Sequence, residues 1–291
     1  MPSVSEIRKL FREYGLAPKK WMGQNLLVDS RYLTRIGETA RIEEGEPLVE
    51  IGAGLGFLTE ELRGRGAKIY ALEIDSGFFR VLQKRFSGLP LVELIHADAL
   101  KYDFHGLRER IGRLRVVANL PYNISSRLLF SFSRNSADFS SLHILLQKEV
   151  AHRLLADPGT KEYGVLTVVL AAKATVDILF DIPPRAFFPV PEVTSSLVRV
   201  TFPDPPPLHV TDAALFERLV KISFAGRRKT LRNNLRAFSF TMGTDSVKRA
   251  AEESAIDLAR RGETLSPEEF VRFAEAIHRR AASLPHPTEI E

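Results

Sequence analysis

The sequence predicts an α/β protein with a mostly parallel sheet, an antiparallel edge and a small helical domain at its C-terminal end. Three observations lead to this fold class. Short β-rich runs alternate with helical segments from residue 47 to about residue 122, and an alternating apolar run follows near residue 200. A proline-rich segment then separates this part from a purely helical one.

Four short runs of aliphatic and β-branched residues, each followed by a helical pattern, predict the parallel strands. These runs are Leu48–Ile51, Lys68–Leu72, Leu91–Ile95 and Leu114–Ala118. Strands joined by helices form parallel sheets with right-handed crossovers. Further strands are expected at 142–146, 175–180 and 197–202, and the last two are expected to form the antiparallel edge.

The segment Pro203–Leu208 marks the expected boundary between two domains. Proline lacks an amide donor and fixes its own backbone angle, so this segment cannot join a central strand. We therefore expect a first domain at residues 1–203 and a helical domain at 208–291. In the second domain Ser266 and Pro267 are typical of a helix start. The apolar positions that repeat there at helical spacing are Leu215, Leu219, Ile222, Leu231 and Leu235.

Composition limits the function classes. Of the 291 residues, 44% are apolar and 26% are charged, which is ordinary for a globular protein. The chain has no cysteine, so disulfides, cysteine metal sites and cysteine nucleophiles are excluded. The N-terminal residues are charged and no run of about 18 uncharged apolar residues occurs, so we expect a cytoplasmic protein without a membrane span. The formal net charge of +5 favours a polyanionic partner.

A glycine-rich turn follows the first predicted strand and contains Gly52, Gly54 and Gly56. By itself the motif fits a tight turn, a dinucleotide site or an S-adenosylmethionine site. Its Gly-x-Gly-x-Gly spacing disfavours the version that cradles a pyrophosphate. Glu73, at the end of the second strand, is placed to accept hydrogen bonds from both hydroxyls of a ribose. Asp98, after the third strand, fits either an adenine contact or the N-cap of the next turn.

The fourth strand ends in Asn119-Leu120-Pro121-Tyr122, which suggests chemistry on an exocyclic adenine amine. That amine is a poor nucleophile because its lone pair is delocalised into the ring. The side-chain oxygen of Asn119 and the carbonyl of Leu120 can each accept one amine hydrogen, while Tyr122 stacks on the base. The alternative interpretation is a turn that only ends the strand.

A basic run lies beyond the proline-rich boundary and contains Arg227, Arg228, Lys229 and Arg232. Between residues 218 and 249 the only acid is Asp245. The alternatives are a solvated helix face or contact with nucleic-acid phosphates, and the lack of compensating acids favours phosphates. The histidines show no metal-ligand spacing, so we expect no metal site.

Five motifs in a fixed order carry a resemblance to a known family. They are Lys20–Leu27, Glu50–Thr59, Asn119–Tyr122, Pro183–Pro191 and Phe224–Leu235. With them the sequence resembles the KsgA/RsmA family of small-subunit rRNA adenine dimethyltransferases over nearly its whole length. The resemblance implies a Rossmann-like class I methyltransferase sheet, S-adenosylmethionine as methyl donor and two neighbouring N6,N6-dimethyladenosines near the 3′ end of small-subunit (16S) rRNA.

The resemblance also assigns residues. Cofactor contacts are expected from Asn25, Leu27, Gly52, Gly54, Glu73, Asp98 and Asn119. Phe187 would form a sandwich around the target adenine together with Tyr122, the alternative being an ordinary core aromatic. Two departures from the family pattern are Leu26, where phenylalanine is usual, and Ala53, where proline is usual.

The expected partner is small-subunit rRNA within a pre-ribosomal 30S particle, and we expect a monomer. Two other functions stay open. One is dimethylation of a large-subunit rRNA adenine, as in macrolide-resistance enzymes, and the other is a ribosome-assembly factor that only docks. The motif at Phe224–Leu235 favours the small-subunit enzyme, and the glycine spacing disfavours a nicotinamide oxidoreductase.

Overall fold

The computed structural model describes residues 4–16, 25–236, 238 and 244–282, and these form two compact units. The first unit contains the chain up to Ala151 together with Val176–Phe202, and the second contains His152–Thr175 and the chain from Pro203 onward. The part of the predicted motif before Asn25 lies outside the described residues. The C-terminal tail from residue 283 also lies outside them.

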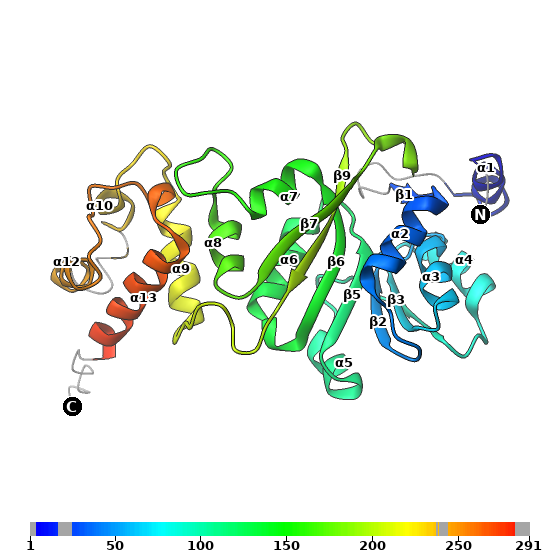
Figure 1. Cartoon of the computed structure of the whole chain (residues 1–291), viewed down its shortest axis with the longest axis horizontal. Helices are drawn as coiled ribbons and strands as arrows, with labels where there is room; N and C mark the ends of the chain where they lie inside the picture. Colours follow the sequence, from blue (N-terminus) through cyan, green and yellow to red (C-terminus); the bar gives the residue numbers. More distant parts are fainter. Residues whose placement is uncertain (1–3, 17–24, 237, 239–243, 283–291) are drawn as a thin grey trace, which may run out of the picture. The chain divides into compact units, whose positions relative to one another are not determined.

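The first unit is built on a seven-stranded sheet with the order β4-β3-β2-β5-β6-β9-β7 (Figure 1). Its strands are β2 (Pro47–Ile51), β3 (Lys68–Glu73), β4 (Val92–His96), β5 (Leu114–Asn119), β6 (Phe139–Gln147), β7 (Thr175–Ile182) and β9 (Ser195–Thr201). The first five strands of that order are parallel, and β9 runs antiparallel to β6. The predicted sheet with its antiparallel strand is therefore confirmed.

Helices cover both faces of this sheet. They are α1 (Val4–Glu13), α2 (Ser30–Ala40), α3 (Phe57–Gly64), α4 (Ser76–Phe86), α5 (Phe104–Ile111), α6 (Ser125–Arg134) and the first part of α7 (Lys148–Leu154). Buried side chains of α1 to α4 form one core cluster with Val117 of β5 and Leu145 of β6. Aromatic contacts join α5 and α6 to β6 through Phe104, Phe132 and Phe139. The sheet is thus packed between two apolar layers.

Short-range signals set the helix ends of the first unit. The side chain of Asp29 caps α2, and that of Asp75 caps α4 by accepting from the amides of Gly77 and Phe78. These caps satisfy amides that a helix leaves without internal partners. Because Asp75 lies two residues after Glu73 of β3, α4 begins right beside the sheet edge at which the strands end.

The second unit is helical. Its helices are α8 (Val165–Ala171), α9 (Ala213–Ser223), α10 (Leu231–Asn234), α12 (Thr244–Glu253) and α13 (Pro267–Ala282). As expected, α13 starts at Pro267, and Ser266 and Glu269 hydrogen-bond reciprocally across its first turn. The apolar face of α9 differs from the expected one, because Phe216, Leu219 and Val220 are buried while Leu215 and Ile222 are only partly buried.

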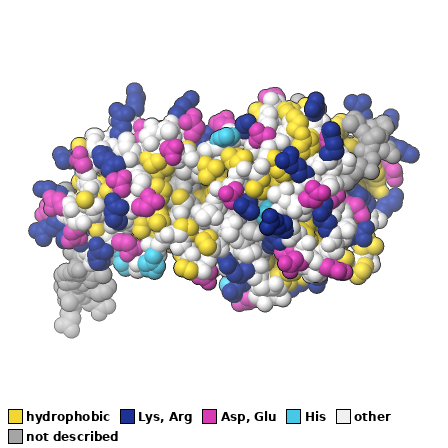
Figure 2. Space-filling view, in the orientation of Figure 1, with side chains coloured by type: hydrophobic (Ala, Val, Ile, Leu, Met, Phe, Trp, Pro, Cys, Tyr) yellow, Lys and Arg dark blue, Asp and Glu magenta, His cyan; other side chains and the backbone are white. Residues whose placement is uncertain are grey.

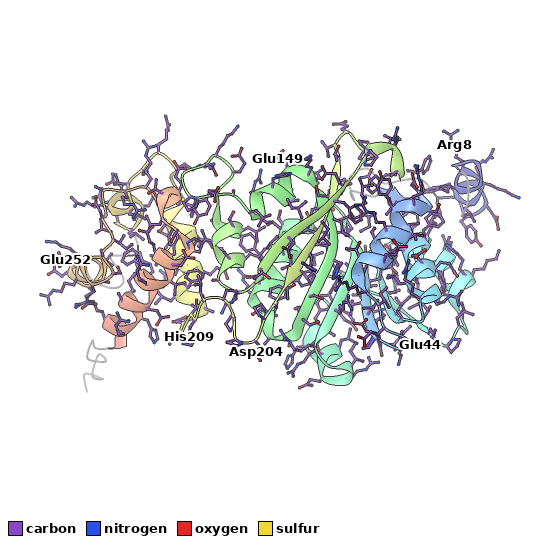
Figure 3. The ribbon with its side chains drawn as sticks, in the orientation of Figure 1. Arg8, Glu44, Glu149, Asp204, His209 and Glu252 are labelled. Carbon is purple, nitrogen blue, oxygen red and sulfur yellow. The ribbon has the colours of Figure 1, made fainter. Side chains whose placement is uncertain are left out.

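Residues 152–175 belong to the second unit, whereas the sequence analysis put them in the first domain. The physical reason is that α8 packs against α9 and α13, and that the hydroxyl of Tyr163 donates to the carbonyl of Leu265 at 2.8 Å. The boundary after Phe202 coincides with the start of the proline-rich segment. Asp204 lies in this segment and His209 follows it (Figure 3). Among the described residues, no helix is long and apolar enough to cross a bilayer.

Candidate active site

The carboxyl ends of β2, β3, β4 and β5 meet at one cleft of about 260 Å³ in the first unit. Ligands of open α/β sheets bind at this edge. The cleft brings together the predicted site residues Asn25, Gly52, Gly54, Glu73, Asp98, Asn119 and Leu120. Three other predicted residues, Leu27, Tyr122 and Phe187, do not line it.

The glycine-rich turn is a backbone surface of the cleft. Gly52 and Gly54 have φ angles of +73° and +58°, which side-chain-bearing residues rarely adopt. A Cβ atom on Gly52 would approach Cδ of Pro121 at 3.3 Å, and one on Gly54 would lie 2.7 Å from Cδ2 of Leu26. Glycine at both positions therefore keeps room between this turn, the Asn119–Tyr122 segment and the chain at Leu26.

Glu73 is the carboxylate that holds the turn in place. It is 5% exposed, and its Oε2 accepts from the amide of Gly54 at 2.8 Å while its Oε1 accepts from the amide of Asp75 at 2.8 Å. Burial raises the pKa of Glu73, and these backbone hydrogen bonds oppose the rise. Each carboxylate oxygen can accept more than one hydrogen bond, so Glu73 can still receive ribose hydroxyls while it fixes the turn.

Glu50 is a second buried carboxylate close to the turn, and no role was predicted for it from the sequence. Its Oε2 accepts from the hydroxyl of Thr59 at 2.6 Å. Burial raises the pKa of Glu50 to about 8, with a further contribution from the charge of Glu73. Its place beside the glycine motif was visible in the sequence, but its burial was not.

Asp98 lies in the cleft two residues after β4 ends. Its Oδ1 accepts from the amide of Leu100 at 2.9 Å, as the interpretation as a turn cap expects. A carboxylate has a second oxygen, so this bond is compatible with an adenine contact as well. The two interpretations of Asp98 are therefore not exclusive.

The side chain of Asn119 has a defined orientation. Its Nδ2 donates to the backbone carbonyl of Asn25 at 2.7 Å. A carbonyl only accepts, so the amide nitrogen must face Asn25, and the side-chain oxygen is left as the acceptor of Asn119. Because Asn25 and Asn119 are 94 residues apart, this bond was not visible in the sequence.

Tyr122 follows Asn119 and is anchored at both ends. Its hydroxyl hydrogen-bonds Oγ of Ser195 at 2.5 Å, and its carbonyl accepts from the hydroxyl of Ser125 at 3.1 Å. The phenol is half-buried, and burial raises its pKa. The ring of Tyr122 is thus fixed beside the segment that ends β5.

Phe187 and Leu27, which were expected to contact the adenine and the cofactor, are both nearly buried. They pair with each other in a small antiparallel sheet formed by β1 (Leu26–Leu27) and β8 (Phe187–Phe188), and they are 2% and 4% exposed. Side chains alternate across a strand, so burial of Leu27 turns Leu26 toward the cleft. Leu26 therefore lines the cleft, and the roles expected for Phe187 and Leu27 stay predictions.

Several cleft residues were missed by the sequence analysis. Ile74 follows Glu73 and is 49% exposed at the cleft, and Phe78 of α4 also lines it. An apolar residue directly after a strand-ending acid was a usable signal for Ile74. Arg127 of α6 lines the cleft too, and the sequence offered no signal for it because arginine on a helix is ordinarily a solvated surface residue.

The basic run of the second unit has two kinds of members. Figure 2 shows Lys and Arg interleaved with Asp and Glu on the visible face, so the partners of each cation decide its availability. Arg227 is engaged internally, through Glu263 at 2.9 Å and the carbonyls of Lys161 and Thr160. Arg228, Lys229 and Arg232 are exposed, and within the described part of the chain their side chains make no hydrogen bond or ion pair.

Comparison with known proteins identifies the family. The family model described as ribosomal RNA adenine dimethylase matches residues 16–278. The chain belongs to this family. The dimethylase is 38% identical over 271 residues to ribosomal RNA small subunit methyltransferase A of Clostridium botulinum, covering 93% of this chain and 98% of that one. It is 40% identical to the protein of the same name from Magnetococcus marinus, covering 94% and 97%.

Solved structures agree with the family. A dimethyladenosine transferase from Plasmodium falciparum superposes with a TM-score of 0.72 at 25% identity, covering 88% of this chain and 98% of that one. The 23S rRNA methyltransferase ErmE superposes with a TM-score of 0.62, also at 25% identity, covering 87% and 100%. The predicted class I methyltransferase fold is confirmed, and the interpretation as an oxidoreductase is excluded.

The dimethylase uses S-adenosylmethionine as methyl donor. The cleft residues fit this molecule: Glu73 suits the ribose, Asp98 suits the adenine amine, and Gly52 and Gly54 leave room for close approach. Among the described residues no cluster of three or more His, Asp or Glu side chains is placed to hold a metal ion.

Proposed function

We propose that this dimethylase converts two neighbouring adenines near the 3′ end of small-subunit rRNA to N6,N6-dimethyladenosine. The relatives named small subunit methyltransferase A support this substrate, because the chain covers nearly all of their length. The motif at Phe224–Leu235 also supports a small-subunit substrate, because it resembles the small-subunit enzymes. Family membership by itself establishes the reaction, which is dimethylation of adenine in ribosomal RNA.

The orientation of Asn119 is the observation that carries the proposed chemistry. Its Nδ2 is committed to the carbonyl of Asn25, so its oxygen is the group that can accept a hydrogen of the adenine amine. Accepting that hydrogen favours a pyramidal nitrogen with a localised lone pair. A preorganised acceptor needs no rearrangement during the reaction, and such contacts contribute most when they are fixed in advance.

Leu120 and Tyr122 complete the proposed acceptor site. The backbone carbonyl of Leu120, which precedes Pro121 and lies at the cleft, is proposed to accept the second amine hydrogen. Tyr122, held by Ser195, is proposed to stack on the flipped adenine. Bound S-adenosylmethionine supplies an electrophilic methyl group, so these residues need only hold the amine in line with it.

The two domains are proposed to divide the work. The first unit is proposed to bind the cofactor with the help of Asn119, and the second unit, which carries the basic run, is proposed to dock on the RNA. Arg228, Lys229 and Arg232 are the proposed phosphate contacts, because they are exposed cations without described partners. We further propose that the enzyme acts as a monomer on a pre-ribosomal 30S particle in the cytoplasm.

A direct test offers unmethylated small and large ribosomal subunits separately to the enzyme with labelled S-adenosylmethionine. The proposal predicts that label enters adenines of the small subunit alone. Labelling of the large subunit would indicate instead the activity named for the structural neighbour ErmE. Binding without labelling would indicate a factor that only docks.

A further inference from the structure

Arg127 is a cation at the cleft to which the proposed reaction gives no role. It is the third residue of α6 and lines the same cleft as Asn119 and Asp98. Its side chain is exposed at the cleft surface. Only two residues separate the Asn119–Tyr122 segment from α6, so the chain brings Arg127 close to the residues that are proposed to hold the target amine.

The fold itself does not use the charge of Arg127. Within the described residues its guanidinium makes no hydrogen bond and no ion pair. Other arginines of this unit are engaged, for example Arg31 with Asp29 and Arg85 with the carbonyl of Leu55. A cation in the first turn of a helix is disfavoured by the helix dipole. Helix stability therefore does not explain arginine at this position.

The chemistry of the cleft indicates what Arg127 binds. S-adenosylmethionine carries a positive sulfonium, and the acidic residues Glu73 and Asp98 already suit its adenosine. An added cation does not help that part of the cofactor and could pair only with the carboxylate of its methionine end, an outcome that calorimetry of S-adenosylmethionine binding separates from phosphate binding. RNA brings a phosphate on each side of the target nucleotide, and arginine matches phosphate with two parallel N–H donors.

We propose that Arg127 binds a backbone phosphate of the rRNA segment that carries the target adenine, which positions its amine at Asn119. The inference rests on the proposed rRNA substrate. Phosphate contacts fix register without reading bases, so Arg127 acts as a positioning residue. The contact is local to the cleft and separate from the basic run of the second unit.

The test compares Arg127→Met with Arg127→Lys on unmethylated small subunits with labelled donor. Lys68→Met is the matched control. Lys68 is an exposed cation at the opposite end of β3 from Glu73, about 17 Å along the strand. For each variant kcat and KM are measured at several salt concentrations, and S-adenosylmethionine binding is measured by calorimetry.

For Arg127→Met we expect KM for the subunit to rise roughly tenfold, because loss of one charge-assisted hydrogen bond weakens binding by about this factor. The dependence of log affinity on log salt should become shallower by about 0.7 to 0.9, because one phosphate contact is lost. Arg127→Lys should keep the salt slope and recover part of the affinity. Cofactor affinity should stay unchanged, and Lys68→Met should resemble the wild type.

Two results overturn the inference. Unchanged KM and salt slope in Arg127→Met would show that no phosphate is bound there. Weakened S-adenosylmethionine binding with unchanged subunit affinity would show that Arg127 binds the cofactor. Failure of the proposed function is recognised separately, because the wild-type enzyme would then not label the small subunit at all.

Discussion

The cleft of the first unit and the basic run of the second differ in how their polar side chains are held. In the cleft the polar groups are buried or held, as Glu73 is by two backbone amides and Asn119 by the carbonyl of Asn25. In the basic run Arg228 and Lys229 are exposed and have no partner within the described residues.

The difference suits the ligands proposed for the two regions. A small cofactor is recognised by a few directed hydrogen bonds, so preorganisation of the cleft determines affinity and rate. A polyanion is recognised by charge through counterion release, so exposed cations without fixed geometry suffice. Variants in the cleft should therefore change chemistry or donor affinity, and variants in the basic run should change the salt dependence of RNA binding.

The largest effect is expected for Asn119→Ala. Loss of one preorganised polar contact should lower kcat by about 100-fold or more. Binding of RNA should persist, so kcat measured at saturating donor and RNA checks the assignment. Asn135→Ala is the matched control, because Asn135 is an exposed asparagine that bonds only locally, to the carbonyl of Ser131. Near wild-type turnover of Asn119→Ala at saturating substrates would contradict the proposed role.

Substitution of Glu73 should act on donor binding. Glu73→Ala should weaken S-adenosylmethionine binding by about 2 to 4 kcal/mol, because charge-assisted hydrogen bonds to the ribose are lost. The same change also removes the acceptor of the Gly54 amide. Glu73→Gln separates the two roles, since its side-chain oxygen can keep one backbone contact. Calorimetry that finds unchanged donor affinity in both variants would mean that the ribose is held elsewhere.

The basic run offers an internal control for the salt dependence. Changing Arg228, Lys229 and Arg232 together to glutamine should make the salt slope of subunit binding shallower by about two to three. Arg227→Gln should leave the slope unchanged and lower the melting temperature, because it loses Glu263 and two carbonyls. Donor affinity should not change in either variant. If only Arg227→Gln changed the slope, the assignment of free and engaged cations would be reversed.

If neither variant changed the slope, the docking surface would lie elsewhere. Exposed cations on α1, among them Arg8 (Figure 3), would then be the next candidates.

The smallest effect concerns Glu50 and pH. Burial raises the pKa of Glu50 from the usual 4.5 to about 8, so the folded chain retains a proton that the unfolded chain releases. This contribution to stability is complete below pH 4.5 and is lost as pH rises through 8. Glu50→Gln cannot release a proton, so above that pH it should be more stable than the wild type by a few kcal/mol, at most about 5. Denaturant unfolding across this range measures the gap, and a constant gap would contradict the raised pKa.

Much of the fold was predictable because central parallel strands are buried on both faces and read as short apolar runs. The ends of these strands carry Gly52, Glu73 and Asn119, so their meeting at one edge followed from the fold class. The order of the strands depends on long-range packing and was not visible. Residues 152–175 were misplaced because nothing local in the apolar run Val165–Ala171 indicates which unit it packs against.

The parts of the site that were missed depend on contacts between distant residues. The pairing of β1 with β8 involves two residues on each side, too few for a periodic signal, and it buries Phe187 and Leu27. The engagement of Arg227 depends on Glu263 and on carbonyls 66 and 67 residues away. Sequence patterns supply residue types at strand ends, but the partners of a charge come only from tertiary structure.

The central claim is that this dimethylase modifies small-subunit rRNA through the acceptor group of Asn119. The most direct measurement is mass mapping of small-subunit rRNA after unmethylated subunits have been incubated with enzyme and S-adenosylmethionine. We expect two neighbouring dimethylated adenines near the 3′ end with the wild-type enzyme, and neither with Asn119→Ala over the same time. Methyl groups elsewhere in the RNA, or the same two dimethylated adenines formed equally fast by Asn119→Ala, would contradict it.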